Sequence, residues 1–268
     1  GKVRYQLPVI VSGSTTNEQD IDVHVALYED TLEILNRERF SGRTDLWYTL
    51  LEEDKYEFPE IVHIPAGTCV EQLNIDFDLR GINMTDKWVL PLTIVDDASY
   101  NYMSHPRKNY AKALLRVIPF NDYSGTYDAA QYRIFLKPDV KNPFTISSQR
   151  AFVVDDRTIF IYAGTRNIDY LDRKQYKVFI RFPEKGTDSK LLEVWSDNPE
   201  IELELDEKKA CTFTMNEEMD ELKPYLKKIY ITLYLYYSFK DYTTVPGTKL
   251  EYVVEGSLAM QRNLNTLI

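Results

Sequence analysis

The sequence contains few of the residues on which metal centres and phosphate-binding loops depend: two cysteines, three histidines and ten glycines in 268 residues. Two cysteines exclude a disulfide-dense scaffold and a four-cysteine zinc module. Ten scattered glycines leave little material for loops that cradle phosphates. His24, His63 and His105 show neither His-x-His nor His-Glu-x-x-His spacing, so we expect no metal and no cofactor.

The two cysteines, Cys69 and Cys211, lie far apart in the sequence. A single disulfide between them is one interpretation, but two free, buried thiols are the preferred one. Because neither cysteine has an adjacent histidine and no serine lies in a Gly-x-Ser-x-Gly motif, the sequence predicts no nucleophilic catalyst.

The chain also lacks a basic excess, since 32 Lys and Arg oppose 42 Asp and Glu for a net charge of −10. The short basic pairs Lys208-Lys209 and Lys227-Lys228 are flanked by carboxylates, so we expect no nucleic-acid partner. No apolar run approaches the roughly 18–20 residues of a membrane helix. Membrane attachment is expected only through an N-terminal lipid anchor that is absent from this chain.

Alternation of apolar and polar residues is the dominant pattern, as in Ile21–Val25, Leu73–Phe77 and Ile201–Leu205. This period of two is typical of strands with one buried and one solvated face. The sequence therefore predicts an all-β protein. Two stretches, Glu29–Arg39 and Glu217–Lys228, have helical spacing and are expected to form short helices inside connections, although Pro224 interrupts the second.

A cluster of turn-forming residues, Pro119–Gly125, divides the chain. Residues 1–118 suit an immunoglobulin-like β-sandwich in which Trp88 is a core aromatic. Residues 119–268 contain about eight strand candidates, which predicts an antiparallel β-barrel, calycin-like, or a second β-sandwich. These candidates centre on Tyr127–Leu136, Ala151–Val154, Thr158–Ala163, Tyr176–Phe182, Leu191–Trp195, Ile201–Leu205, Ile229–Phe239 and Leu250–Met260.

Carboxylates are numerous but form no catalytic or metal motif. Glu200, Glu202 and Glu204 have the spacing of a glycosidase pair, yet their alternation with aliphatic residues favours a solvated strand face. Asp155-Asp156 and the Asp169–Asp172 segment offer oxygen ligands for calcium without matching an EF-hand loop. We therefore expect the protein not to be an enzyme.

Aromatic residues are abundant: 20 Tyr, 12 Phe and 3 Trp. Sugar rings present apolar C–H faces that stack on flat aromatic side chains. Most of the tyrosines are explained by strand packing, which leaves a few residues in loops or at strand ends as ligand-binding candidates. These candidates are Trp195, Tyr170, Tyr242, Asp169, Asp172 and Arg173.

Several segments carry a family resemblance: Tyr5–Val9, Lys55-Tyr56, Val62–Gly67, Trp88–Ile94, Pro119–Tyr127, Phe160–Gly164, Tyr236–Asp241 and Glu255–Asn263. In this order they resemble two-domain Bacteroides-type surface lipoproteins of unassigned function. The resemblance implies an immunoglobulin-like N-terminal domain, a C-terminal β domain, a lipid anchor on the outer-membrane surface and association with polysaccharide-utilisation systems. It supplies no catalytic residue.

The leading functional prediction is a non-catalytic cell-surface protein that binds a glycan or oligosaccharide, or assists glycan uptake beside other surface uptake proteins. One alternative is a structural or adhesive module that binds another protein. Another is a calycin-like barrel that holds a small apolar ligand.

Overall fold

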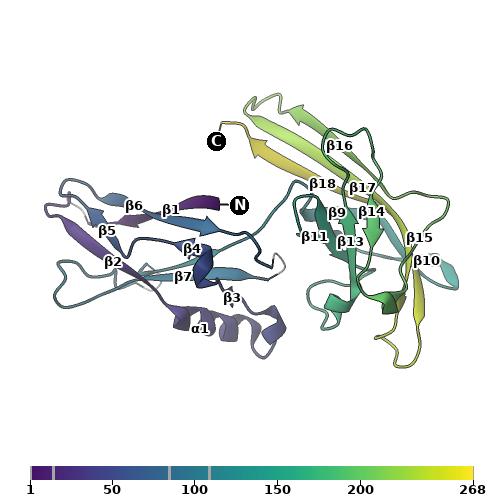
Figure 1. Ribbon diagram of the computed structural model, residues 1–268, viewed down its shortest axis with the longest axis horizontal. Coiled ribbons are helices and arrows are strands. Elements are labelled where there is room, and N and C mark those ends of the chain that lie inside the picture. The colour runs from purple at the N-terminus through teal and green to yellow at the C-terminus, as the bar shows by residue number, and fades with distance from the viewer. Residues whose placement is uncertain (1, 14–15, 84–85, 108–109, 268) are drawn as a thin grey trace. The chain divides into compact units, whose positions relative to one another are not determined.

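A computed structural model of the chain describes residues 2–13, 16–83, 86–107 and 110–267. The chain divides into two compact units, residues 1–118 and 119–268, and each is built mainly from β-strands (Figure 1). The prediction of an all-β protein is confirmed. None of the helices in these ranges has the length and apolar character needed to cross a bilayer.

The N-terminal unit contains two sheets. One has the order β1-β6-β4 and the other β3-β7-β2-β5, with β8 paired to β7. The strands are β1 (Lys2–Ile10), β2 (Ile21–Leu27), β3 (Thr49–Leu50), β4 (Tyr56–Glu57), β5 (Ile61–Ile64), β6 (Val70–Asp78), β7 (Trp88–Ile94) and β8 (Lys112–Arg116).

The two sheets of this unit share one core. Leu73 and Ile75 of β6 are fully buried in the same cluster as Val23 of β2 and Trp88 and Leu90 of β7. The alternating pattern assigned Val23, Leu73 and Ile75 to the buried face, and Trp88 is a core aromatic as predicted. The arrangement is that of a β-sandwich, in which the inner faces of two sheets interdigitate.

Helix α1 (Glu29–Phe40) follows β2 and contacts β7 (Figure 1). The expectation of a helix from residue 29 is confirmed, but the helix is longer than a single turn. Asn36, buried in α1, donates to the backbone oxygen of Tyr48 at 2.9 Å and accepts from the Tyr48 N–H at 2.7 Å. This amide fixes the return of the chain through the 3-10 helix η1 (Thr44–Leu46); a second 3-10 helix, η2 (Glu53–Lys55), follows β3.

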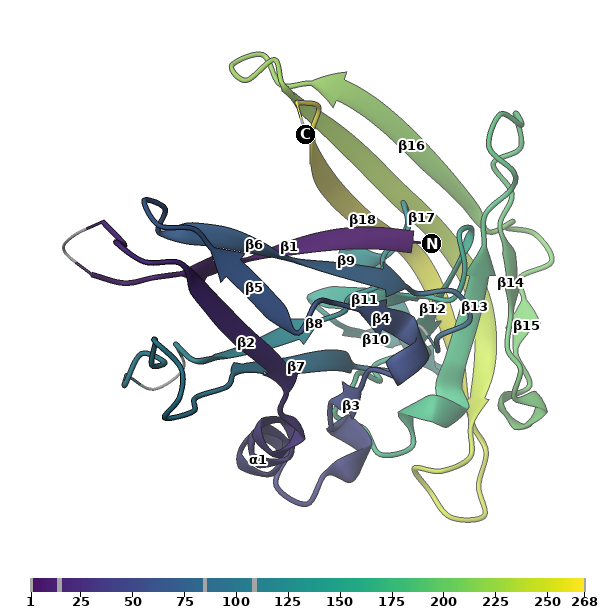
Figure 2. The ribbon, with the colours of Figure 1, turned by 60° about the vertical axis from the view of Figure 1, so that its left-hand side comes forward.

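The C-terminal unit is one large antiparallel sheet (Figure 2). Its order is β14-β13-β12-β11-β9-β18-β17-β15, with β10 on β9 and β16 on β17. The strands are β9 (Gly125–Leu136), β10 (Asp139–Thr145), β11 (Ser148–Val153), β12 (Thr158–Tyr162), β13 (Lys177–Arg181), β14 (Glu193–Trp195), β15 (Glu204–Leu205), β16 (Thr212–Met219), β17 (Leu226–Asp241) and β18 (Leu250–Asn265).

This sheet closes on itself next to β14. A β-bridge joins Leu191 to Thr212. On either side of it the Leu192 N–H donates to the Cys211 oxygen at 2.9 Å and the Phe213 N–H donates to the Lys190 oxygen at 3.0 Å. Of the two architectures predicted for residues 119–268, the structure is therefore the barrel.

Side chains fill the barrel. Tyr132 and Tyr237 are fully buried, and their hydroxyls are 2.8 Å apart; burial is the main reason why the pKa of each is raised. Elsewhere in the same core, Phe182 and Phe213 pack edge to face and both contact Tyr123. A core packed in this way gives no support to the alternative of an apolar ligand inside the barrel.

The predicted turn at Pro119–Gly125 is a packed part of the barrel. The side-chain oxygen of Asn121 accepts from the N–H groups of Tyr123 and Ser124 at 3.0 and 2.7 Å. Arg262 of β18 donates to the backbone oxygens of Asn121 and Ser124 at 2.8 and 2.6 Å. Of the two interpretations of this segment, a linker or a sharp turn, the structure shows the turn.

Two sequence predictions in this unit are wrong. Glu217–Lys228 is a hairpin rather than a helix: Glu218 pairs with Lys228 across β16 and β17, and Asp220 caps the turn by accepting from the N–H groups of Leu222 and Lys223. Ion pairs across the hairpin, of Lys227 with Glu217 and of Lys228 with Asp220, take the place of helical contacts.

The expected strand Ile201–Leu205 is formed only at its end: Ile201 closes the 3-10 helix η4 (Pro199–Ile201), residues 202–203 are irregular, and Glu204–Leu205 form the short strand β15. Glu202 has a positive φ of 43° and bonds to the ammonium groups of Lys240 and Lys249. These hydrogen bonds lower the pKa of the Glu202 carboxyl to about 2. The glutamates therefore do not line one solvated strand face.

Candidate functional site

The structure separates the six predicted ligand-binding residues into two groups. Asp169, Tyr170, Asp172 and Arg173 lie between β12 and β13, at and before the 3-10 helix η3 (Arg173–Tyr176). Trp195 ends β14, and Tyr242 follows β17.

The first group surrounds Arg166, a residue that no sequence motif singled out. Its side chain is only 5% exposed and forms ion pairs with Asp172 at 3.1 Å and Asp241 at 3.0 Å. The guanidinium carbon lies 3.5 Å from the centre of the Tyr176 ring. Desolvation opposes the charged forms, but hydrogen bonds and ion pairing outweigh it, so the pKa of Arg166 is raised and that of Asp241 lowered.

Most polar groups of the first group are used inside the protein. Asp172 also accepts from the Thr243 hydroxyl at 2.5 Å, and the buried Arg173 donates to the backbone oxygen of Tyr170 at 2.9 Å. Asp169 is exposed and its N–H donates to Asn167. Tyr170 is 44% exposed. These contacts hold the loop between β12 and β13 in place, and the Tyr170 ring lies at the protein surface.

In the second group, Asn198 bonds to Tyr242 and to Gln175. Its amide nitrogen donates to the Tyr242 hydroxyl at 3.0 Å and to the backbone oxygen of Gln175 at 2.9 Å. The Tyr242 hydroxyl donates in turn to the Gln175 side-chain oxygen at 2.7 Å, and the Trp195 indole N–H donates to Asp197 at 3.0 Å. Trp195 and Tyr242 therefore each bond to a residue of the Ser196–Pro199 turn, Trp195 to Asp197 and Tyr242 to Asn198.

Trp195 is also the end of a row of aromatic rings, here called the aromatic ladder: Phe152, Phe160, Phe179 and Trp195. The four residues lie opposite one another in register on β11, β12, β13 and β14. Neighbouring ring centres are 4.9, 6.0 and 5.4 Å apart along the row, and the first and last pairs are stacked. Their strand neighbours Ile159, Ile161, Val178, Ile180 and Val194 point into the barrel core, so the ladder lies on the outer surface of the barrel wall.

A depression of about 500 Å³ adjoins the ladder beside Phe179. Its walls combine a flat aromatic surface with amide, hydroxyl and charged groups. The lining residues are Lys174, Gln175, Lys177, Phe179, Ser196, Asp197, Asn198, Pro199 and Tyr242. An open hollow with apolar rings and a few convergent polar groups can hold a ring-shaped polar ligand.

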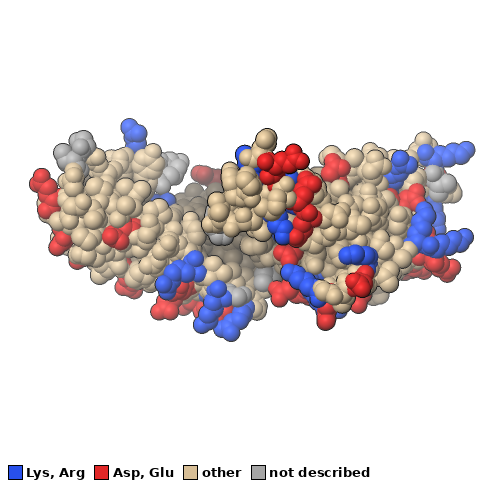
Figure 3. Space-filling view, turned by 90° about the horizontal axis from the view of Figure 1, so that it is seen from above, with Lys and Arg blue, Asp and Glu red and all other residues tan. Residues whose placement is uncertain are grey.

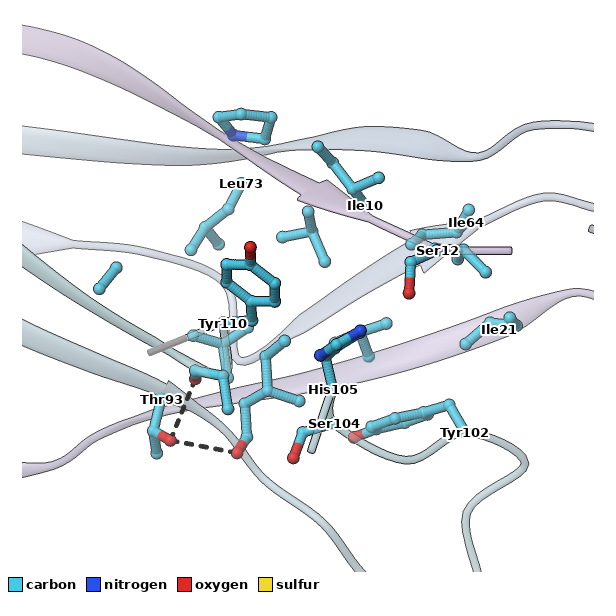
Figure 4. Close-up of a pocket in the computed structure, with 18 of the residues that line it drawn as sticks. Ile10, Ser12, Ile21, Ile64, Leu73, Thr93, Tyr102, Ser104, His105 and Tyr110 are labelled. Atoms are coloured by element: carbon cyan, nitrogen blue, oxygen red, sulfur yellow. Dashed lines mark hydrogen bonds between the residues drawn. The ribbon is translucent and has the colours of Figure 1, made fainter. Parts of the chain in front are cut away.

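A second hollow, of about 570 Å³, lies in the N-terminal unit between β1 and β8. Figure 4 shows the rings of Tyr102, His105 and Tyr110 around it and the aliphatic side chains of Ile64 and Leu73 within. Ile64 and Leu73 also belong to the sandwich core, so this hollow opens onto the core of the unit. Hydroxyl, amide, imidazole and ammonium groups also line it, among them those of Ser12, Asn101, Ser104, His105 and Lys112.

Metal-ligating and nucleophilic residues form no further site in the described ranges. No group of three or more His, Cys, Asp or Glu residues could hold a metal ion there. Both Cys69 and Cys211 are free thiols, and burial raises the pKa of the Cys211 thiol. Basic and acidic side chains are interspersed on the surface in Figure 3.

Comparison with known proteins identifies relatives along the whole chain. The profile of a domain of unknown function, DUF4973, matches residues 1–98, and a C-terminal domain profile matches residues 111–259. No protein of curated function matches significantly.

Three solved structures from Bacteroides cover 100% of this chain. A structural-genomics protein of unknown function from Bacteroides ovatus is 49% identical, with 88% of that chain covered and a TM-score of 0.85. A multidomain protein including DUF1735 from the same species is 48% identical, with 88% covered and a TM-score of 0.84. An auxiliary nutrient binding protein from Bacteroides thetaiotaomicron is 41% identical, with 86% covered and a TM-score of 0.86.

Proposed function

This chain belongs to the family that these Bacteroides proteins form, with an N-terminal DUF4973 domain and a C-terminal β domain, and from that premise we propose that it is a non-catalytic glycan-binding accessory protein of the cell surface. The observation that carries the proposal is the aromatic ladder beside the depression at Asn198. The name of one relative, an auxiliary nutrient binding protein, agrees with such a role.

The chemistry of the depression fits a sugar ring. The apolar face of a pyranose stacks on an aromatic side chain, and its hydroxyls need hydrogen-bonding groups at the ring edge. Phe179 lines the depression and stacks on Trp195, and Gln175, Asn198 and Tyr242 add amide and hydroxyl groups to its walls.

The same depression is poorly equipped for glycoside hydrolysis, which normally uses two carboxyl groups flanking the scissile bond. Asp197 is the one carboxylate among its described lining residues, and the Trp195 indole already donates to it. We therefore propose binding rather than cleavage.

Truncation of Trp195 tests the site. For the oligosaccharide that binds best in a panel of host and dietary glycans, we expect Trp195→Ala to weaken affinity at least about tenfold, or about 1.4 kcal/mol, because the stacking surface is lost. Isothermal titration calorimetry of the whole chain measures the change.

The matched control is Tyr234→Ala, which removes a half-buried ring on β17, outside the ladder and the depression. Its affinity should equal that of the wild type. Equal affinities for wild type and Trp195→Ala would reject this site, and a folded wild type that binds no glycan in the panel would reject the function.

We further propose that the mature protein is held on the outer-membrane surface by an N-terminal lipid anchor and acts with other uptake proteins of a polysaccharide-utilisation system. The family resemblance supports this placement. In cells that make the natural protein, we expect the protein to become labelled when the cells are fed an alkyne fatty acid. We also expect protease added to intact cells to digest it. A protein that is unlabelled and protected from protease would contradict the placement.

An adhesive role by strand addition is less well supported. The edge strand β1 contains Pro8, which has no N–H to offer a partner strand, and the edge strand β8 carries Lys112 and Arg116. Proline and basic residues on edge strands oppose strand pairing.

A further inference from the structure

Three cations lie along the aromatic ladder, and from them we infer that the ligand is an anionic glycan, whose sugar rings carry carboxylate or sulfate groups. The inference rests on the proposed glycan-binding function and adds the class of sugar to it.

Each cation is placed against a ring of the ladder. The guanidinium carbon of Arg150 lies 5.2 Å from the centre of the Phe152 ring. The ammonium of Lys177 lies 4.7 Å from Phe160, and the guanidinium carbon of Arg181 lies 5.1 Å from Trp195. Aromatic rings hold cations at such distances, so the positive groups are fixed at the stacking surface.

The charge of this face is opposite to that of the whole chain. Its outward residues on the four strands, all within the described ranges, are Ser148, Arg150, Phe152, Thr158, Phe160, Tyr162, Lys177, Phe179, Arg181, Glu193 and Trp195. Glu193 is the one acid among them, and it lies 3.5 Å from Arg181 at a well-exposed position. Three cations against one carboxylate give a local positive excess in a chain of net charge −10.

The depression next to the ladder extends this positive surface, because Lys174 and Lys177 both line it. Its one described carboxylate, Asp197, is bonded to the Trp195 indole. An anionic group on a sugar stacked at Phe179 would lie among lysines rather than carboxylates.

The acidic character of the whole protein does not oppose such binding at physiological salt. Charges separated by more than about 8 Å of solvent are largely screened at 0.15 M ionic strength. The nearest groups therefore determine the preference, and arginine and lysine are the residues that bind carboxylate and sulfate groups most effectively.

The test compares matched pairs of ligands that differ only in charge. Galacturonate oligosaccharides are compared with their carboxyl-reduced forms, and a sulfated galactan oligosaccharide with its desulfated form, by calorimetry of the whole chain in 0.05 and 0.15 M salt. We expect at least one anionic member to bind about tenfold or more tightly than its neutral partner, with a smaller advantage at the higher salt.

Variants separate the charge from the stacking surface. Arg150→Gln and Lys177→Gln should remove most of the preference for the anionic partner, and Arg150→Gln, which lies outside the depression, should leave affinity for the neutral partner within about twofold. Trp195→Ala should weaken the binding of both the anionic and the neutral ligand. Lys209→Gln is the matched control, because Lys209 lies 5.2 Å from the Tyr236 ring, away from the ladder, and it should change neither affinity.

Equal binding of charged and neutral partners would overturn the inference and leave the glycan-binding function in place. A preference that survives both glutamine variants would overturn it as well. Failure of every ligand, neutral and anionic, to bind the folded protein would reject the proposed function together with the inference.

Discussion

Replacing Gly256 by alanine is expected to unfold the C-terminal barrel. Gly256 has φ +126°, and a Cβ at this position would lie 1.9 Å from the backbone oxygen of Gln131 on the neighbouring strand. Both strands are central in the sheet, so neither can move aside without breaking the pairing of β18 with β9 and β17. We expect a loss of more than about 4 kcal/mol in the free energy of unfolding.

The matched control for this glycine is Gly247→Ala. Gly247 also has a positive φ, of +76°, but no atom lies within 4 Å of the position that a Cβ would occupy there. Backbone strain alone should cost about 1–2 kcal/mol at this residue. Urea denaturation, with hydrogen exchange to assign the transition to residues 119–268, measures both variants. Equal losses for the two would show that the close approach at Gln131 is unimportant.

The second large effect is expected at Asp241. Its carboxylate is 2% exposed and accepts from Arg166, Tyr176, Thr243 and Thr244. Removing one partner of a buried ion pair leaves the other charge uncompensated, so Asp241→Ala should lower the free energy of unfolding by about 3–5 kcal/mol. Chemical denaturation at pH 7 measures the loss.

An exposed ion pair in the same unit provides the control. Asp122 lies 2.6 Å from Lys185 with both side chains largely in solvent, so Asp122→Ala should cost no more than about 1 kcal/mol. The double variant Arg166→Met with Asp241→Leu should recover part of the loss, because the Arg166 charge is no longer left buried without Asp241 and Asp172 keeps its hydrogen bond from Thr243. A loss at Asp241 no larger than that at Asp122 would contradict the role given to this network.

The same network predicts a pH dependence. The pKa of Asp241 is lowered in the folded protein, because hydrogen bonds outweigh the opposing effect of burial. Its stabilising contribution is therefore complete above the ordinary aspartate pKa of about 3.9 and is lost as the pH falls through the lower folded value. The difference between wild type and Asp241→Ala should shrink below about pH 4, and a difference that stays constant down to pH 2 would contradict this.

Much of the fold follows from local patterns in the sequence. Alternation in Ile21–Val25 and Leu73–Phe77 correctly predicted strands of the sandwich, because one face of each is buried. The same pattern gave a wrong prediction at Ile201–Leu205. Pro199 starts a 3-10 helix there, and lysines from β17 and from the loop after it hold Glu202 in a left-handed conformation. Such distant partners leave no local signal.

The candidate site was only partly visible for the same reason. Trp195 was identified at a strand end and Tyr242 in a loop, but the hydrogen bond of Tyr242 to Asn198 joins chain segments that are far apart in sequence. Arg166 was missed because Asp241, its buried partner, lies on another strand. The rings of the aromatic ladder lie on four different strands in the sequence, and only the strand register reveals that they adjoin.

The stacking within the ladder has a consequence for the entropy of binding. Phe160 is 1% exposed between its neighbours, and Phe179 and Trp195 already stack on each other without a ligand. Immobilising a side chain on binding typically costs about 0.5–1.5 kcal/mol, and rings fixed during folding avoid most of that cost. A ligand can therefore bind to this rigid surface, and leave it, without the strands rearranging.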